Sequence, residues 1–92
     1  MIERVQWSVE SLHFLQNLES QRFAEHETSE YQRKLVHEIE RKIMLLGTSM
    51  PSREAAYRGT YRVLVGRHKV YYSFDGSGTV AYIESIKHMR MQ

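Results

Sequence analysis

The stretch GTYRVLVGRHKVYYSF, residues 59–74, decides the fold of this 92-residue chain. Every second residue of 61–65 is apolar or aromatic, and the same pattern returns over 70–74. This two-residue period is typical of strands that bury one face. Gly66-Arg67 separates the two runs at the position where the chain has to turn. The stretch therefore predicts a β-hairpin.

A second hairpin is predicted directly after the first. Asp75-Gly76-Ser77-Gly78 has the composition of a turn, and residues 79–86 read as a final strand. Two consecutive hairpins give an antiparallel meander. At the other end of the chain, residues 2–7 alternate as a short strand with Val5 and Trp7 on one side.

A first amphipathic helix is predicted over residues 9–25. Ser8 offers an N-cap, and the polar residues 25–28 are expected to turn the chain. Phe14 falls off the apolar stripe of this helix. The stripe consists of Leu12, Leu15 and Leu18.

A second helix is predicted from Ser29 to Leu46. Ser29 and Gln32 match a capping box, and Gly47 is a natural residue to follow the helix end. Its apolar residues recur at helical spacing and are Tyr31, Leu35, Ile39, Ile43 and Leu46. We expect the two helices to form an antiparallel hairpin over the apolar face of the meander. The predicted fold is α+β, a single domain over residues 1–92 with the order β-α-α-β-β-β, in which a helical hairpin packs on a small antiparallel sheet.

The composition excludes several kinds of site. The chain has no cysteine, which excludes disulfides and thiolate metal sites. The apolar run over residues 43–46 is far too short to span a membrane, and the first residues predict no signal peptide. A cytoplasmic location is therefore expected.

Positive charge is concentrated in the second part of the chain. Residues 1–50 contain six Lys/Arg and eight Asp/Glu (net −2), and residues 51–92 contain seven and three (net +4), which sum to the total of +2. Uneven solvated charge is common in small proteins, but here tyrosines and histidines accompany the cations. We expect a compact surface suited to a polyanion, with RNA as the leading candidate. Its converging members are Arg58, Arg62, Arg67, His68, Lys69, Lys87, His88 and Arg90.

Four segments carry a resemblance to a known family. The first strand ends in Gln6-Trp7-Ser8, and a helical hairpin follows it. Residues 59–65 match the pattern G-x-[YW]-R, and residues 68–72 match [YH]-R-[VIL]-x-Y except that Lys69 replaces the arginine. Residues 86–90 match a closing H-x-R. Together these segments span essentially the whole chain and resemble the RelE/ParE superfamily of bacterial and archaeal toxins.

The resemblance implies a partner and two alternative activities. Toxins of this superfamily are made beside an antitoxin that wraps and neutralises them. The RelE-like branch cuts mRNA on the ribosome, and the ParE-like branch poisons DNA gyrase. Two departures weaken the match to the first branch. Lys69 cannot make the bidentate phosphate contact of an arginine, and residues 91–92 hold no counterpart of the terminal tyrosine of some RNA-cleaving members.

The candidate site residues form a catalytic set and a binding set. Metal-free RNA cleavage requires a base, an acid and cations that stabilise the phosphate. We expect His88 to do the acid–base work, because free imidazole titrates near pH ~6.5. Lys69 would hold the phosphate, and Glu54 would be an alternative base. The RNA-binding set is Arg58, Arg62, Arg67, Tyr71, Lys87 and Arg90, in which Tyr71 would stack on a base.

Ordinary structural roles remain open for each of these residues. His88 can be a surface histidine, Lys69 a solvated strand cation and Glu54 a solvated loop residue. His68 is expected to be solvated beside the turn, on the side of the sheet opposite Lys69. The histidines of the first half, namely His13, His26 and His37, lack ligand-like spacing, so no metal site and no cofactor are expected.

Three functions follow from this sequence. The preferred one is the toxin of a type II toxin–antitoxin system that acts as a ribosome-dependent, metal-independent mRNA endoribonuclease and inhibits translation. The first alternative is a non-enzymatic inhibitor of DNA gyrase. The second is a degenerate member that binds only its antitoxin and, with it, operator DNA. In each case the expected partner is an acidic cognate antitoxin.

Overall fold

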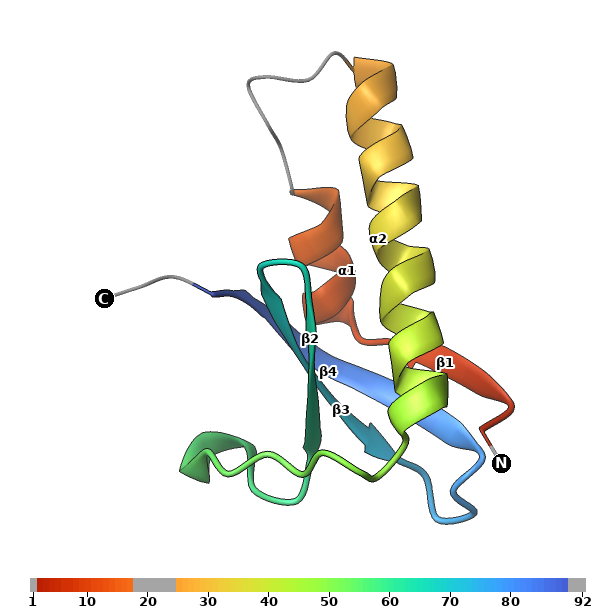
Figure 1. Cartoon of the computed structure of the whole chain (residues 1–92), viewed down its shortest axis with the longest axis vertical. Helices are drawn as coiled ribbons and strands as arrows, with labels where there is room; N and C mark the ends of the chain where they lie inside the picture. The colour runs from red at the N-terminus through yellow and green to blue at the C-terminus, as the bar shows by residue number, and fades with distance from the viewer. Residues whose placement is uncertain (1, 18–24, 90–92) are drawn as a thin grey trace.

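A computed structural model of the chain describes residues 2–17 and 25–89 (Figure 1). Its four strands are β1 (Arg4–Trp7), β2 (Tyr61–Val65), β3 (His68–Phe74) and β4 (Val80–His88). Its helices are α1 (Val9–Gln16), α2 (Glu25–Leu46) and the single 3-10 turn η1 (Ala55–Tyr57). Within these described residues, no helix is both long and apolar enough to cross a membrane.

The strands form one sheet with the order β1-β4-β3-β2. β2 pairs antiparallel with β3, and β3 pairs antiparallel with β4, which confirms the meander. β1 runs parallel to β4, from Arg4 opposite Val80 to Trp7 opposite Ile83. The sheet is therefore mixed rather than purely antiparallel, because the chain crosses over through both helices before it returns beside β1. The α+β class and the order of elements are confirmed.

The helix boundaries differ from those predicted. Ser8 does cap α1, since its Oγ accepts a hydrogen bond from the Ser11 N–H at 3.1 Å. However, α1 ends at Gln16 with Asn17 as its C-cap, so the helix predicted to reach residue 25 is too long. α2 already includes residues 25–28, so the polar turn predicted there and the cap at Ser29 are wrong. Polar residues such as glutamate are good helix formers, and they extend the helix through this segment. Leu18 lies outside the described residues.

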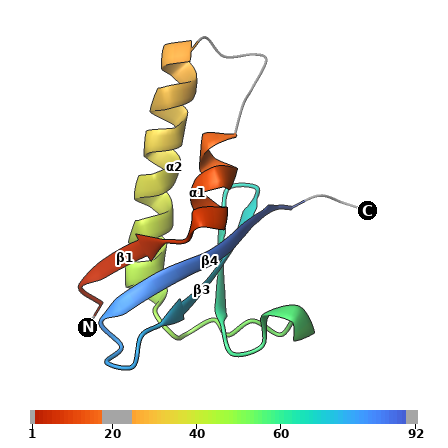
Figure 2. The ribbon, with the colours of Figure 1, turned by 180° about the vertical axis from the view of Figure 1, so that it is seen from behind.

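α1 lies along the part of β4 that β1 leaves unpaired (Figure 2). The Ser8 N–H donates to the Ile83 carbonyl at 3.1 Å, and the Ser8 Oγ donates to the Glu84 carbonyl at 3.1 Å. Next to these contacts, the Ser85 Oγ donates to the Glu10 carboxylate at 2.8 Å. Phe14, predicted to lie off the apolar stripe, packs against the core.

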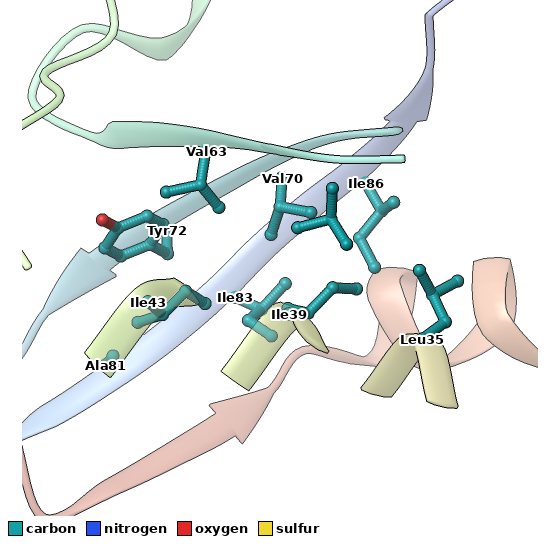
Figure 3. Close-up of a cluster of buried hydrophobic side chains, with 10 residues drawn as sticks. Leu35, Ile39, Ile43, Val63, Val70, Tyr72, Ala81, Ile83 and Ile86 are labelled. Carbon is teal, nitrogen blue, oxygen red and sulfur yellow. The ribbon is translucent and has the colours of Figure 1, made fainter. Parts of the chain in front are cut away.

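The core lies between one face of α2 and one face of the sheet. From α2 it receives Leu35, Ile39 and Ile43, which are buried as their helical spacing predicts, whereas Tyr31 is exposed. Figure 3 shows these side chains pointing at those of the three meander strands. The sheet contributes Val63, Val65, Val70, Tyr72, Ala81, Ile83 and Ile86. Gly47 ends the helix at φ +53°, a backbone conformation that favours glycine, and the Tyr72 hydroxyl donates to its carbonyl.

A β-bulge interrupts the pairing of β3 with β4. Tyr72 pairs with Ile83, but Tyr71 pairs with Ser85, so Glu84 is an extra residue on β4. An extra residue reverses which face each later side chain occupies. Ile83 and Ile86 are both buried in the core although they are three residues apart, which an uninterrupted strand would not allow. The bulge therefore decides which residues near the end of β4 point away from the helices.

The packing of the core predicts that truncation to alanine at two positions on α2 will change the free energy of unfolding by very different amounts. Ile39→Ala removes a fully buried side chain and leaves a cavity between helix and sheet, so it should lower the free energy of unfolding by about 2–5 kcal/mol. Leu45→Ala is the matched control, because Leu45 is 71% exposed and its truncation should change stability by less than about 0.5 kcal/mol. Urea denaturation measures both. Equal losses would contradict this packing of α2.

Candidate functional site on the open face of the sheet

The sheet face that points away from α2 carries most of the candidate residues. We call it the open face, and define it by the alternates of the buried residues, namely Arg62 and Leu64 of β2, Lys69 and Tyr71 of β3, and Ser85 and Lys87 of β4. Their register places Arg62 beside Tyr71, and Leu64, Lys69 and Lys87 in one row across the strands. The segment that contains η1 contributes Glu54 and Tyr57 to the same face, as their contacts with Tyr71 show.

Lys69 and Lys87 are direct cross-strand partners. Like charges at directly opposed positions repel one another. Carboxylates offset this repulsion, because Glu54 acts electrostatically on both lysines and Glu10 acts on Lys87. The Tyr57 side chain, followed by these two carboxylates, raises the pKa of Lys87. Lys87 therefore presents an ammonium group to solvent at neutral pH.

Glu54 is the anionic centre of the open face. The Tyr71 hydroxyl and the Arg62 Nη1 both donate to its Oε2, the latter at 3.3 Å. The hydrogen bond from Tyr71 is the main cause that lowers the pKa of Glu54, Lys69 and Arg62 lower it further, and desolvation opposes them. No hydrogen bond from the described residues reaches Oε1. Glu54 is thus an ionised carboxylate that keeps one oxygen available, as its half-exposed side chain allows.

Tyr71 is fully buried. It therefore cannot stack on a base, and that prediction is wrong. Tyr57 lies on its ring with centroids 3.9 Å apart and planes 11° apart, and so covers it. Burial is the first cause that raises the pKa of Tyr71 to about 12, and Glu54 adds to it. Tyr71 therefore positions Glu54 rather than contacting a ligand. Tyr57 is the more accessible aromatic group here, with the Lys87 Nζ 5.4 Å from its ring centroid.

His88 does not join Lys69, which corrects the central expectation for the site. His88 pairs with His68, and their ring centroids are 5.5 Å apart. His68 points into the helix side of the sheet, where Phe14 packs edge-on against it at 5.6 Å. Because side chains alternate along a strand, His88 lies on the opposite side from Lys87 and Lys69. His68 lies opposite Lys69 as predicted, but it is only 3% exposed and so is not solvated.

The remaining predicted cations do not form one compact set with Lys69. Arg58 directly follows η1, before β2 begins, and Arg67 lies in the turn after β2 ends, both with exposed side chains. They therefore lie toward opposite ends of a five-residue strand. Arg90 lies outside the described residues. The structure brings together Glu54, Arg62, Lys69, Tyr71 and Lys87 on the open face, and places His88 on the other side of the sheet.

The chain resembles solved toxin structures over nearly its whole length. It aligns with the RelBE2 toxin–antitoxin complex from Mycobacterium tuberculosis at a TM-score of 0.68 and 18% identity, over 96% of this chain and 93% of that chain. The chain has the RelE fold. The isolated RelE toxin of E. coli aligns at a TM-score of 0.58 and 11% identity, over 98% of this chain and 87% of that one. No protein-family model and no curated protein matches the sequence.

Two residues of this RelE-fold surface were missed from the sequence. Tyr57 was one tyrosine among several, and its place over Tyr71 depends on the fold of the loop that contains η1. Glu10 lies far from the meander in sequence and reaches Ser85 because α1 lies against β4. The η1 segment shows no periodicity that would have signalled its contact with the sheet.

The pKa of Glu54 should depend directly on Tyr71. Tyr71→Phe keeps the ring under Tyr57 but removes the main hydrogen bond that lowers the carboxyl pKa, so the pKa of Glu54 should rise. An NMR titration of the side-chain carboxyl carbon measures it. Tyr82→Phe is the control, since Tyr82 is an exposed tyrosine near the other end of β4. An unchanged pKa in Tyr71→Phe would contradict the hydrogen bond.

Burial of His68 predicts a loss of stability in mild acid. Burial is the main cause that lowers the pKa of His68, the charge of His88 lowers it further, and the Val65 backbone opposes both. The unfolded chain binds this proton near pH ~6.5 and the folded chain resists it. Above that pH His68 is neutral in both states, and the free energy of unfolding is at its full value. As pH falls from there through the lowered pKa of folded His68, the unfolded chain takes up the proton first and the free energy of unfolding decreases.

Urea denaturation from pH 8 to pH 5 tests this expectation. His68→Leu should flatten the loss of stability below pH ~6.5. His37→Gln removes an exposed histidine of α2 and should leave the loss unchanged. A slope that persists in His68→Leu would assign the proton uptake to another group.

Proposed function

We propose that this chain is the toxin of a toxin–antitoxin pair, and that its open face binds mRNA on the ribosome and cleaves it. The observation that carries the proposal is the Glu54 carboxylate held among the cations of Arg62, Lys69 and Lys87. A base next to several cations meets two of the requirements for cleavage by the 2′-hydroxyl, and water can supply the acid. The RelE fold is consistent with it.

In this mechanism Glu54 takes the proton of the attacking 2′-hydroxyl. Its Oε2 is held by Tyr71 and Arg62, so Oε1 accepts the proton. The low pKa makes Glu54 a weak base but keeps it ionised at every physiological pH. Its fixed position compensates for this weakness, because a positioned base avoids the entropic cost of assembling the reacting groups.

The lysines stabilise the charge that develops on the phosphate. Lys69 and Lys87 lie side by side and can contact two oxygens of one phosphate, which offsets the lack of an arginine fork at Lys69. Tyr57 offers an aromatic surface next to Lys87 for a neighbouring base. His88 has no role here, because its side chain is on the other side of the sheet. As the 2′-oxygen bonds to phosphorus, the bond to the 5′ oxygen breaks, and that oxygen takes its proton from water.

The antitoxin would be an acidic chain that covers the open face. One of the structures with this fold is a toxin–antitoxin complex. Carboxylates of such a partner would pair with Lys69, Lys87 and Arg62 and exclude RNA from the same surface. Neutralisation and activity would then depend on the same cations.

Induced expression of variants tests the nuclease. Wild type should halt protein synthesis and cut mRNA in the ribosomal A site. Glu54→Gln should slow cleavage about 10²–10⁴-fold by removing the base, and Lys69→Ala about 10²–10³-fold by removing a charge partner of the transition state. His88→Ala should remain active, and so should Lys34→Ala, the control with an exposed α2 lysine replaced. Circular dichroism verifies that each variant folds.

The position of His88 on the helix side of the sheet is compatible with one alternative function. Inhibition of DNA gyrase needs a docking surface and no acid–base group, so an open face without an imidazole is compatible with it. Double-strand DNA breaks without mRNA cleavage, unchanged by Glu54→Gln, would replace the nuclease proposal with this one. Harmless expression of the chain alone would instead favour a member that binds antitoxin and operator without toxicity.

A further inference from the structure

The two histidines on the helix side of the sheet form a close cross-strand pair. The Met89 N–H donates to the Arg67 carbonyl at 2.7 Å, so Arg67 and Met89 are a hydrogen-bonded pair of the ladder. His68 and His88, the next pair along, therefore occupy a non-hydrogen-bonded position, where opposed side chains come closest. Their rings meet at 82° with centroids 5.5 Å apart. The backbone holds two imidazoles edge to face at the end of the β3–β4 ladder that carries the first residue of β3 and the last residue of β4.

One of these imidazoles is buried with at least one nitrogen unpaired. His68 is 3% exposed, and among the described residues neither its Nδ1 nor its Nε2 makes a hydrogen bond of ordinary geometry, although the Val65 backbone lies near enough to raise the pKa of the ring. That backbone group can serve one nitrogen at most, so at least one buried nitrogen is left without a partner and requires an explanation. Phe14 closes one side of the ring and His88 covers another. An uncharged imidazole with a free lone pair, positioned against a second imidazole, is the donor arrangement of a metal site.

We propose that His68 and His88 together bind one divalent transition-metal ion that favours imidazole, such as Cu²⁺, Ni²⁺ or Zn²⁺. Rings that share a tetrahedral ion at Zn–N distances of about 2.0–2.1 Å have centroids about 5 Å apart, close to the separation observed. The site requires the exposed His88 ring to turn so that one of its nitrogens and one of His68 face the same ion. Water completes the coordination, because the described residues contain no cluster of three or more His, Cys, Asp or Glu suited to a metal.

The charges around the pair fit this assignment. The nearest strand lysines, Lys69 and Lys87, occupy the open face and not the side of the sheet on which the ion would lie. Arg67 is exposed in the adjoining turn, so it can move away from a bound cation. With two protein ligands, the order of affinities should follow the general preference for copper over nickel and zinc.

Binding would join the first residue of β3 to the last residue of β4. The residue before His88 is Lys87, whose Nζ lies near Tyr57 on the other face. A bound ion would therefore fix the end of β4 and the position of Lys87 with it. The inference stands on the histidine pair and does not depend on the proposed nuclease.

Titration of the tag-free, metal-free chain with Cu²⁺ alone at pH 7.5 tests the site. Wild type should bind one equivalent, show electron paramagnetic resonance coupling to two imidazole nitrogens, and gain thermal stability because the ion binds the folded chain. His88→Ala changes an exposed side chain, so it should fold and yet lose all three signals. His68→Leu should lose them too.

The control variant replaces His13, His26 and His37 with alanine and should keep all three signals. Copper coupling to two imidazoles that survives in His88→Ala would overturn the proposal. So would a wild-type spectrum with coupling to one imidazole or none. Loss of the bound ion in the triple variant would overturn it as well, by placing the ion elsewhere.

Discussion

The structure depends on β3, a strand that is buried on both of its faces. On one side Tyr72 packs under α2 and donates its hydroxyl to the Gly47 carbonyl, where that helix ends. On the other side Tyr71 lies under Tyr57 and donates to Glu54. Two adjacent tyrosines thus attach the long helix to one side of the sheet and the η1 segment to the other. The hydrophobic burial of the rings and the hydrogen bonds of the hydroxyls are satisfied together, as buried tyrosines require.

This arrangement explains how a small exposed surface acquires a defined electrostatic pattern. Surface ion pairs alone contribute little, because water screens them and long side chains must be ordered. Here the buried hydroxyl of Tyr71 holds the Glu54 carboxylate in place. Lys69 and Lys87 occupy directly paired positions on neighbouring strands of the sheet. The charges on the open face are therefore positioned by the core, although they are themselves exposed.

The sequence predicted those parts of the fold that depend on local patterns. Alternation located β2 and β3, and helical spacing identified the buried face of α2, because both patterns reflect burial directly. Helix ends were less predictable. The capping box at Ser29 is a local pattern, and the helix continues through it because good helix formers precede it. Tyr71 was assigned to the RNA-binding set, but its burial under Tyr57 depends on a long-range contact that no sequence period encodes.

The error over His88 has a specific physical origin. Counting by twos from Ile83 places His88 on the open face with Lys69, which is the arrangement that the sequence suggested. The extra residue at Glu84 shifts the count by one, so that Lys87 reaches the open face and Ile86 returns to the core. Bulges depend on the pairing of two strands, and a single strand's sequence does not reveal them.

Glu84 is therefore a position at which β4 tolerates a change of length better than a change of register. Deleting Glu84 would join Ile83 directly to Ser85, and the regular alternation that results would keep Ile86 in the core and Lys87 on the open face. If all residues of β4 instead paired with β3 without the bulge, Ile86 would point to solvent and the Lys87 ammonium group toward the apolar interior. The cost of burying that charge opposes this regular pairing.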